Sequence, residues 1–314
     1  MPTLLDYRRR IRSVKSTQQI TRAMKFISAA KLRRAQEGVF AARPYAGEIL
    51  RVMRSAAARM ESAAHPLLER RPEEKILVVV LTGDRSLCGA FNTNVIRRAI
   101  LFIQENSSKK SQMIAIGKKG RDTLRKRGWP IAGEYLNVSA KVDFPIAKEI
   151  AGRIAELYAA GEVDAVYAVY NEFKNVMVQN LRTAKLLPID PGMLDEKSAD
   201  KFSMPPTSHA GAEEALPHDL SASGKSQLVD YIYEEPVEEI FGGLVPRYLE
   251  AEVFRILLES AAAEHAARMT AMDSATRNAS DLIDSLTLDM NKIRQASITK
   301  ELIEIVSGAA SATS

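Results

Sequence analysis

Residues 267–310 read ARMTAMDSATRNASDLIDSLTLDMNKIRQASITKELIEIVSGAA, a stretch with helical periodicity and no proline. Between Leu249 and Ile293, apolar residues recur mostly three or four positions apart, the spacing of a helix with a buried stripe. The helical pattern extends from Val237 to about Ser307, and seventy helical residues would measure roughly 105 Å. Such a helix is longer than a compact domain is wide, so part of it must extend beyond the domain to which it belongs.

The last residues of this helix carry a broad apolar surface. At 100° per residue, the apolar side chains from Ile298 to Val306 fall within an arc of roughly 160°. The seam with a single partner helix is narrower than that. We therefore expect this tail to be surrounded by other chains.

A second long helix is predicted over residues 4–60. Its apolar residues do not form one stripe, since Ile11 and Ile20 lie on nearly opposite sides, and this predicts contacts with different partners at different heights. Residues 1–60 carry 14 Lys and Arg against 3 Asp and Glu, whereas residues 237–314 carry 7 against 12. These opposite charges favour pairing of the terminal helices, although each exposed ion pair contributes less than about 1 kcal/mol.

The periodicity changes between these helices. ILVVVLT, residues 76–82, is a short and continuous apolar run, typical of a buried parallel strand and too short to span a bilayer. Further strands are expected at residues 112–117, 163–173 and 175–189, and helices at residues 92–106, 118–128 and 146–161. The alternation of strand and helix predicts a Rossmann-like α/β layer domain over residues 72–190.

The order of the segments predicts how they are arranged. One terminal helix leads into the α/β domain and the other leads out of it, so the two must lie close together there. We expect residues 1–65 and 229–314 to form a long antiparallel α-helical coiled coil with the α/β domain inserted. Residues 191–228 contain several prolines, glycines and serines, and they are expected to form an extended loop with the composition of a disordered segment.

The motifs of common enzyme sites are absent from the sequence. GxxxxGK(S/T), HExxH, GxSxG and a strand followed by GxGxxG do not occur, so no cofactor, metal or catalytic residue is expected. The single cysteine, Cys88, excludes an intrachain disulfide and a CxxC metal site. The basic residues near the N-terminus point all around their helix, which is typical of a solvated or partner-facing surface, and no nucleic-acid partner is expected.

The loop TGDRSLCGAFN, residues 82–92, leaves two interpretations open. It follows the first strand at the end where α/β domains bind ligands, and Asp84, Arg85 and Cys88 could form a small polar site there. The chain would then be an α/β small-ligand enzyme with a helical dimerisation arm. The alternative, which we favour, is a turn that caps the next helix near Asn92.

Four stretches closely resemble the gamma subunit of the bacterial type of rotary F-type ATP synthase. They are SVKSTQQITRAMKFISAAKLRRAQ (13–36), LTGDRSLCGAFNTN (81–94), DYIYEEP (230–236) and the stretch at 267–310 quoted above. They occur in the family's order and cover both ends and the middle of the chain. The resemblance implies the architecture described above, a coiled coil that carries an α/β domain.

The resemblance also implies a function. The coiled coil would be the central shaft inside a hexamer of alternating alpha and beta subunits, and the α/β domain would sit with the epsilon subunit on a membrane ring of proton-carrying c subunits. Rotation driven by protons would take the catalytic sites through different affinities in turn. The chain would regulate ATPase activity and proton flow, but it would not itself catalyse the reaction. It would be a peripheral protein on the cytoplasmic face of the bacterial inner membrane, with no segment inserted in the membrane.

Contacts of the family carry over where its motifs match. The positions that resemble a contact with a beta-subunit loop are Arg294, Gln295, Thr299 and Glu301. The positions that resemble contacts near the beta lever are Met24, Lys25 and Arg268, and for Met24 packing in the coiled coil is an equal alternative. Cys88 resembles a second contact with the hexamer, and Tyr231 and Tyr233 resemble the stretch that faces the ring and the epsilon subunit.

Two features depart from the family pattern. The loop has Gly83, Ser86 and Ala90 where the family more often has TSDRGLCGGLN, so a similar loop with altered flexibility is expected. Residues 191–227 look longer than in typical bacterial gamma chains. They lack the cysteine pair of the chloroplast type, which excludes thiol control by that route.

Overall fold

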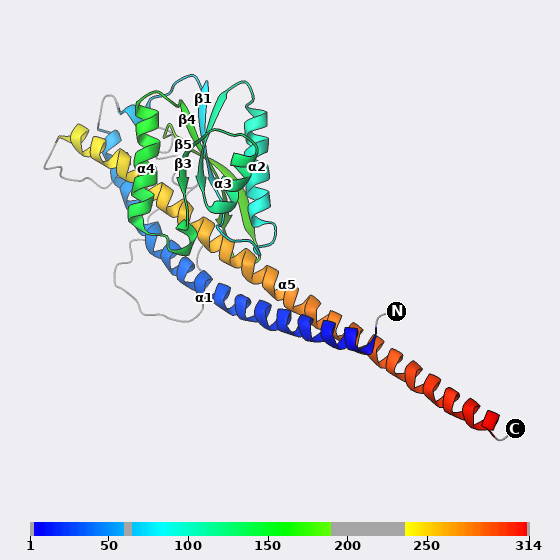
Figure 1. Ribbon diagram of the computed structural model, residues 1–314. Helices are drawn as coiled ribbons and strands as arrows, with labels where there is room; N and C mark the ends of the chain where they lie inside the picture. The colour runs from blue at the N-terminus through cyan, green and yellow to red at the C-terminus, as the bar shows by residue number, and fades with distance from the viewer. Residues whose placement is uncertain (1–2, 60–64, 190–235, 313–314) are drawn as a thin grey trace, which may run out of the picture.

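The computed structural model describes residues 3–59, 65–189 and 236–312. It combines a shaft of two long helices with an α/β domain at one end of the shaft (Figure 1). The shaft consists of α1 (Leu4–Ala57) and α5 (Val237–Ala312). At 1.5 Å per residue these helices are about 80 Å and about 115 Å long. The prediction of two long terminal helices is confirmed.

The two shaft helices pair in one antiparallel register. The hydroxyl oxygens of Thr21 and Thr276 lie 2.8 Å apart, and Lys25 Nζ lies 2.5 Å from Asp273 Oδ1. The numbers of facing residues therefore sum to about 297, which places Leu4 opposite about residue 293. Beyond that point α5 continues as a single helix to the tip of the shaft (Figure 1).

The start of α1 is fixed by its own sequence. Thr3 Oγ1 accepts a hydrogen bond from the Asp6 backbone N–H, and the Asp6 carboxylate accepts one from the Thr3 backbone N–H at 2.9 Å. These reciprocal bonds satisfy two of the backbone donors that a helix start leaves unpaired. The cap therefore sets the point where the two-helix part of the shaft ends.

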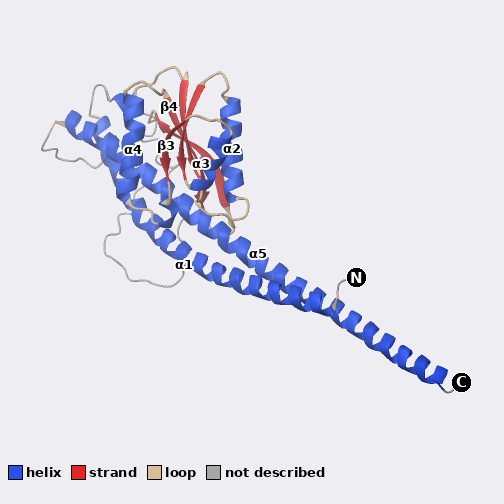
Figure 2. Cartoon of the chain, viewed as in Figure 1, coloured by secondary structure: helices blue, strands red, loops and turns tan. Residues whose placement is uncertain are grey.

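The α/β domain contains a five-stranded sheet with the order β3-β2-β1-β4-β5 (Figure 2). Neighbouring strands are parallel except β5, which runs antiparallel to β4. From β1 to β5 the strands span Lys75–Leu81, Lys110–Ile116, Ile131–Tyr135, Ala165–Phe173 and Gln179–Leu187. β1 is central and is buried from Ile76 onward, as expected for a parallel strand that is covered on both faces.

Helices cover both faces of this sheet. The remaining elements are α2 (Phe91–Glu105), α3 (Lys118–Lys126), α4 (Phe144–Ala159) and the 3₁₀ helices η1 (Pro66–Leu68) and η2 (Val138–Ala140). One face of the sheet packs against α2 and α3. The other face packs against α4, the end of α1 and the first part of α5, where Met53 of α1 is fully buried. The shaft is thus continuous with the core of the domain.

The predicted fold class is confirmed, with one strand missed. β3 was not predicted, because its residues are half-buried or exposed and IAGEY offers no continuous apolar run. The predicted helix at residues 118–128 ends at Lys126. The predicted loop at residues 191–228 lies outside the described residues, and the predicted domain limits stay predictions. None of the described helices is both long enough and apolar enough to cross a membrane.

Glu73, in the loop before β1, holds several strands together at one edge of the sheet. Its carboxylate accepts hydrogen bonds from Lys109 Nζ at 2.8 Å, from Lys185 Nζ at 2.7 Å and from the Tyr167 hydroxyl at 3.0 Å. Burial alone would raise the pKa of Glu73, but these bonds outweigh it and lower the pKa to about 2. The contacts are made by residues of β4 and β5 and of the loop before β2.

We expect the lowered pKa of Glu73 to make part of the stability depend on pH. A carboxyl whose folded pKa lies below its unfolded value of 4.5 stabilises the fold above that pH, and the contribution is lost as the pH falls towards 2. Glu73→Gln should lower the free energy of unfolding at pH 7 by about 1 kcal/mol, allowing for partial exposure. Urea unfolding of both proteins from pH 7 down to pH 3 measures the difference, which should shrink below pH 4.5. A difference that does not change with pH would contradict this assignment.

Candidate functional site

The loop at residues 82–92 lies at the carboxyl end of β1 and is held by hydrogen bonds. Asp84 Oδ1 accepts bonds from the backbone N–H groups of Lys118 and Asn137, both at 3.0 Å, and Asp84 Oδ2 accepts one from Ser139 Oγ at 3.3 Å. These partners lie at the start of α3 and around η2. The Asp84 carboxylate is therefore engaged in joining three segments of the domain.

Asn92, in the first turn of α2, holds the rest of the loop. Its side-chain oxygen accepts a hydrogen bond from the Gly83 backbone N–H at 2.8 Å. Its Nδ2 donates to the Arg85 carbonyl at 3.2 Å and to Cys88 Sγ at 3.1 Å. Among the described residues no side chain caps this helix, which begins after Ala90, so the predicted cap near Asn92 is not formed. Asn92 instead closes the loop onto α2, and in this respect the loop is the turn that we favoured.

The chemistry of an enzyme site is not assembled here. Cys88 is buried, and burial raises the pKa of its thiol, which disfavours the reactive thiolate. Within residues 3–59, 65–189 and 236–312, no group of His, Cys, Asp and Glu side chains could hold a metal ion. A hollow of about 420 Å³ beside the loop is lined by Phe91, Met177, Ala267 and Ala271 among others. The interpretation as a small-ligand enzyme is not supported.

Residue 83 is a glycine at a position with no room for a Cβ atom. A Cβ placed on Gly83 would come within 2.8 Å of the Glu264 carboxylate oxygens, closer than real Cβ contacts allow. Glu264 Oε1 in turn accepts a hydrogen bond from Arg268 Nη2 at 2.7 Å, and both side chains are buried. A residue with a Cβ at this position would therefore require the Glu264–Arg268 pair to move. The predicted change in flexibility is a separate matter and stays a prediction.

The predicted contacts on the paired part of the shaft differ in exposure. Met24 and Lys25 are half-buried, and Lys25 pairs with Asp273 across the seam. Cys88 and Arg268 are buried within this chain, and Arg268 pairs with Glu264. For these last two residues, burial favours a role in the packing of this chain. Their predicted contacts with a partner stay predictions.

The N-terminal half of α1 has an unusual distribution of polar and apolar side chains. Thr21 and Ser28 are buried at the seam, with 8% and 2% of their surface exposed. Ile20, Phe26 and Ile27 are 57–61% exposed. An isolated coiled coil would show the opposite distribution. Phe26 was not predicted as a contact residue. It could have been noticed as a large aromatic residue at a helix position that does not face the partner helix.

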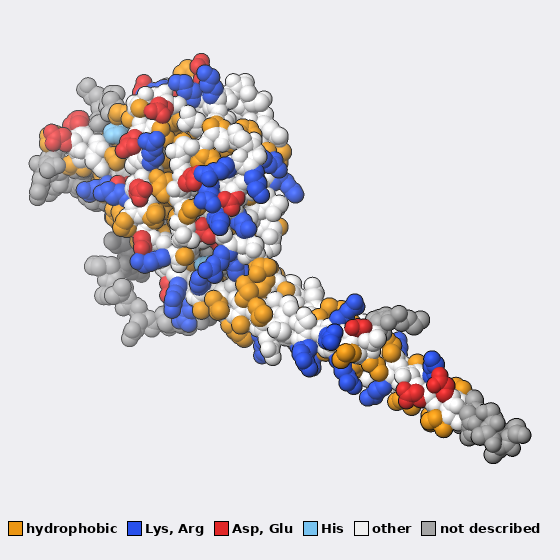
Figure 3. Space-filling view, viewed as in Figure 1, with side chains coloured by type: hydrophobic (Ala, Val, Ile, Leu, Met, Phe, Trp, Pro, Cys, Tyr) orange, Lys and Arg blue, Asp and Glu red, His pale blue; other side chains and the backbone are white. Residues whose placement is uncertain are grey.

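The tip of the shaft brings together the other predicted contacts. Arg294, Gln295, Thr299 and Glu301 are all exposed, and the one hydrogen bond among the described contacts of these side chains is the 3.3 Å bond from Ser297 Oγ to Glu301. Exposed apolar side chains lie between and beyond them, and Figure 3 shows orange patches along this part of the shaft. They are Ile298, Leu302, Ile303 and Ile305, with 49–68% of their surface exposed. Tyr231 and Tyr233 lie outside the described residues.

Comparison with known proteins places the whole chain in one family. A family model described as ATP synthase matches residues 3–312. The ATP synthase gamma chain of Solibacter usitatus is 51% identical, over 99% of this chain and 100% of the relative. The gamma chain of Pelotomaculum thermopropionicum is 46% identical, over 99% of each chain.

Solved structures agree with the fold. The rotor of the Euglena gracilis mitochondrial ATP synthase in rotational state 1 contains a chain that matches with a TM-score of 0.59 and 21% identity, covering 94% of this chain and 98% of that one. A chain of the central stalk and c-ring of the Tetrahymena thermophila enzyme matches with a TM-score of 0.55 and 23% identity, covering 82% and 99%. At these identities the structures support the fold alone, whereas the sequence relatives establish the family over the full length. The chain belongs to the ATP synthase gamma chain family.

Proposed function

We propose that this chain is the central rotor shaft of a proton-translocating ATP synthase. The observation that carries the proposal is the single helix beyond residue 293, whose apolar side chains are exposed in the described part of this chain. Burial of such side chains is favourable, so a helix of this kind fits a sleeve formed by other chains. We assign the sleeve to the upper collar of a hexamer of alternating alpha and beta subunits.

The same proposal assigns the other end of the molecule. The α/β domain would rest with the epsilon subunit on the membrane ring of c subunits, on the cytoplasmic face of the bacterial inner membrane. Rotation of the ring would turn the domain and the shaft together. The asymmetric shaft would then change the affinities of the catalytic sites, which belong to the beta subunits, while this chain itself is non-catalytic. Its partners are proteins only, with no nucleic acid.

The proposed contacts divide by height along the shaft. At the tip, Arg294, Gln295, Thr299 and Glu301 would meet a polar loop of a beta subunit. Closer to the α/β domain, Met24, Lys25 and Arg268 would lie near the beta lever region, and Cys88 would make a second contact with the hexamer. Tyr231 and Tyr233 would face the ring and the epsilon subunit. The exposure of the four tip residues supports the first of these groups.

Purification from membranes under native conditions tests the proposed function. The chain carrying an affinity tag should be recovered together with alpha and beta subunits in a complex that hydrolyses ATP. The purified chain alone should show no hydrolysis. Recovery of the chain from membranes without alpha and beta subunits would contradict the proposal.

Changing Arg294 and Gln295 together to alanine distinguishes a contact with the beta subunit from a contribution to the stability of this chain. Both residues are exposed surface positions on the single-helix part of α5, so their removal should change the free energy of unfolding of the chain by less than about 0.5 kcal/mol. Synthesis of ATP by the reconstituted complex should fall clearly, because the proposed contact with the beta subunit is lost. Lys300→Ala is a matched control, since Lys300 is also exposed on this helix. If the double variant also lowered the free energy of unfolding by clearly more than about 0.5 kcal/mol, a role of the two residues in packing would be indicated instead.

A further inference from the structure

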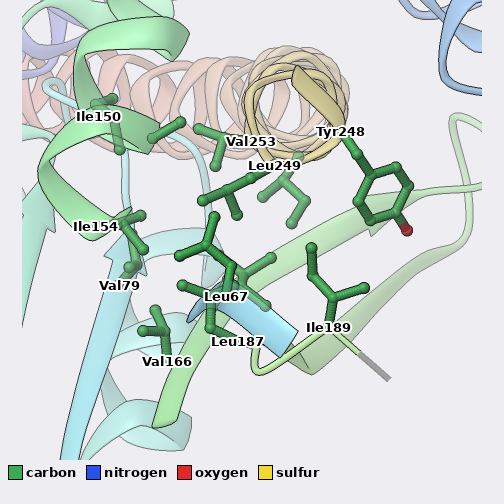
Figure 4. Packing of buried hydrophobic residues seen from close by; sticks show 14 of the residues in the cluster. Leu67, Val79, Ile150, Ile154, Val166, Leu187, Ile189, Tyr248, Leu249 and Val253 are labelled. Atoms are coloured by element: carbon green, nitrogen blue, oxygen red, sulfur yellow. The ribbon is translucent and has the colours of Figure 1, made fainter. Parts of the chain in front are cut away.

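Apolar side chains are exposed at the end of the α/β domain where the shaft leaves it. Leu87, in the loop after β1, is 56% exposed, Met177, between β4 and β5, is 84% exposed, and Leu181, on β5, is 39% exposed. We call these three side chains the shoulder surface. Inside the domain, in contrast, apolar residues such as Leu249 and Val253 are enclosed by other apolar side chains (Figure 4). Single exposed apolar residues are common, whereas apolar residues gathered on one surface mark a contact with another molecule.

The shoulder surface borders the hollow of about 420 Å³ described above. This hollow lies between the loop at residues 82–92, the hairpin that joins β4 to β5, and residues 267–274 of α5. Figure 3 shows orange side chains where the domain meets the shaft. None of the described residues that line the hollow carries a charge. The hollow therefore fits an uncharged apolar side chain better than a carboxylate or an ammonium group, which would lose hydration there without gaining a partner of opposite charge.

The hairpin holds Met177 outward through a defined turn. Val176 packs against the buried cluster that contains Cys88. Asn175 Oδ1 accepts hydrogen bonds from the backbone N–H groups of Met177 at 2.9 Å and of Val178 at 2.7 Å. These contacts anchor the hairpin on one side and fix its backbone on the other. The exposure of Met177 is thus imposed by the turn, and the side chain has no place in the core of this chain.

The backbone of Leu87 gives a second, independent indication. Leu87 has a φ of 67°, in the left-handed region that residues with a Cβ rarely adopt and that glycine or asparagine enters with less strain. Its neighbour Cys88 points inward and is 1% exposed, so the strained turn places the leucine outside and the cysteine inside. Strained backbone of this kind concentrates at functional sites. A strained leucine whose side chain is more than half exposed is better explained by a contact than by the stability of this chain.

We propose that the shoulder surface binds an uncharged apolar segment at the lower rim of the alpha–beta hexamer, and that part of the coupling passes through this contact. The inference rests on the proposed rotor function. α5 runs from Ser274, at the hollow, to Ile305, in the exposed tip, over about 47 Å. A sleeve around the tip therefore has its open end turned towards the shoulder surface. The second contact proposed for Cys88 is then made by its exposed neighbour Leu87, while the buried Cys88 supports the loop.

Photocross-linking in the assembled complex identifies the partner. Met177→Cys provides a site for a benzophenone maleimide, and the natural Cys88 is buried and does not compete for the reagent. After irradiation we expect cross-links from this position to an alpha or beta subunit. Leu101→Cys is the matched control, because Leu101 is 45% exposed but lies on α2, and it should give no such product. Cross-links of Met177→Cys to the epsilon subunit, to a second copy of this chain or to no other chain would overturn the inference, as would equal cross-linking from both positions.

A polar version of the shoulder surface tests its part in coupling. Leu87→Asn combined with Met177→Gln keeps the backbone, because asparagine tolerates a positive φ, so the urea midpoint of the purified chain should not fall. Synthesis of ATP by the reconstituted complex should drop about fivefold, the scale of an ordinary coupling free energy. Leu101→Gln, the matched control, should leave synthesis as it is. Unchanged synthesis by the double variant, or an equal loss in the control, would overturn the inference. Failure of the proposed function itself looks different, since the unaltered chain would then not assemble with alpha and beta subunits.

Discussion

Replacement of Gly117 by alanine is expected to lower the free energy of unfolding by more than about 4 kcal/mol. Gly117 lies between β2 and α3 with a φ of 92°, a conformation that side chains with a Cβ rarely adopt. A Cβ there would lie 2.0 Å from the Thr82 carbonyl oxygen. This atom belongs to the backbone and cannot move aside without disturbing the loop that follows β1.

The hydrogen bonds around Gly117 show why the damage would spread. Thr82 N donates to the Ile116 carbonyl at 2.8 Å, and Gly117 N donates to the Tyr135 carbonyl at 2.8 Å. Together these bonds tie the carboxyl ends of β1, β2 and β3. Displacing either backbone therefore loosens the edge of the sheet that positions the loop at residues 82–92.

Gly152→Ala is the matched control for Gly117→Ala. Gly152 lies in α4, and a Cβ there would meet no atom of the described residues within 4 Å. Alanine favours the helix over glycine, so this variant should gain up to about 1 kcal/mol. Urea unfolding of the purified chain, followed by circular dichroism, measures both. Equal stability of the two variants would show that the backbone near Thr82 is less constrained than described.

Replacement of Arg268 by methionine is the second change with a large expected effect. The Arg268 guanidinium pairs with Glu264 at 2.7 Å, and the two side chains are only 11% and 4% exposed. Removing one partner leaves the other charge buried without compensation, which costs about 3–5 kcal/mol. If the main role of Arg268 were contact with a beta subunit, the isolated chain would lose much less stability.

A double-mutant comparison strengthens this test. Glu264→Gln combined with Arg268→Met removes both charges and should recover much of the lost stability. Arg33→Met is the control, because the Arg33–Glu37 pair has the same spacing on an exposed helix surface and should contribute less than about 0.5 kcal/mol. A double variant no more stable than Arg268→Met alone would show that the pair is not the source of the effect.

The long helices were predictable because their signals are strong and repeated. Helical periodicity over residues 237–307 predicted one of them, and the dominance of helix-forming residues over residues 4–60 predicted the other. Chain order predicted their antiparallel pairing. The register was not predictable, since it depends on a few contacts such as Thr21 with Thr276, which no periodicity identifies. β3 was missed because a short edge strand does not need a continuous apolar run.

The candidate site was predictable in a different way. The exposed tip residues came from motif resemblance, and their exposure in the structure agrees with a surface role without testing it. The burial of Arg268 was not predicted, because a charged residue in a helix is normally expected to be exposed. Only the structure shows that its partner four residues earlier, Glu264, is buried as well. This burial depends on how deeply α5 is set into the domain, which is a tertiary property.

The end of the paired register at about residue 293 also has a mechanical consequence. Below this point a sideways load is shared by two helices, whereas above it one helix about 10–12 Å wide carries the load alone. Bending stiffness rises steeply with width, so the tip is the compliant part of the molecule and the paired part is the rigid one. The tip can therefore bend to fit the shape of a surrounding sleeve, while the two-helix part of the shaft stays straight.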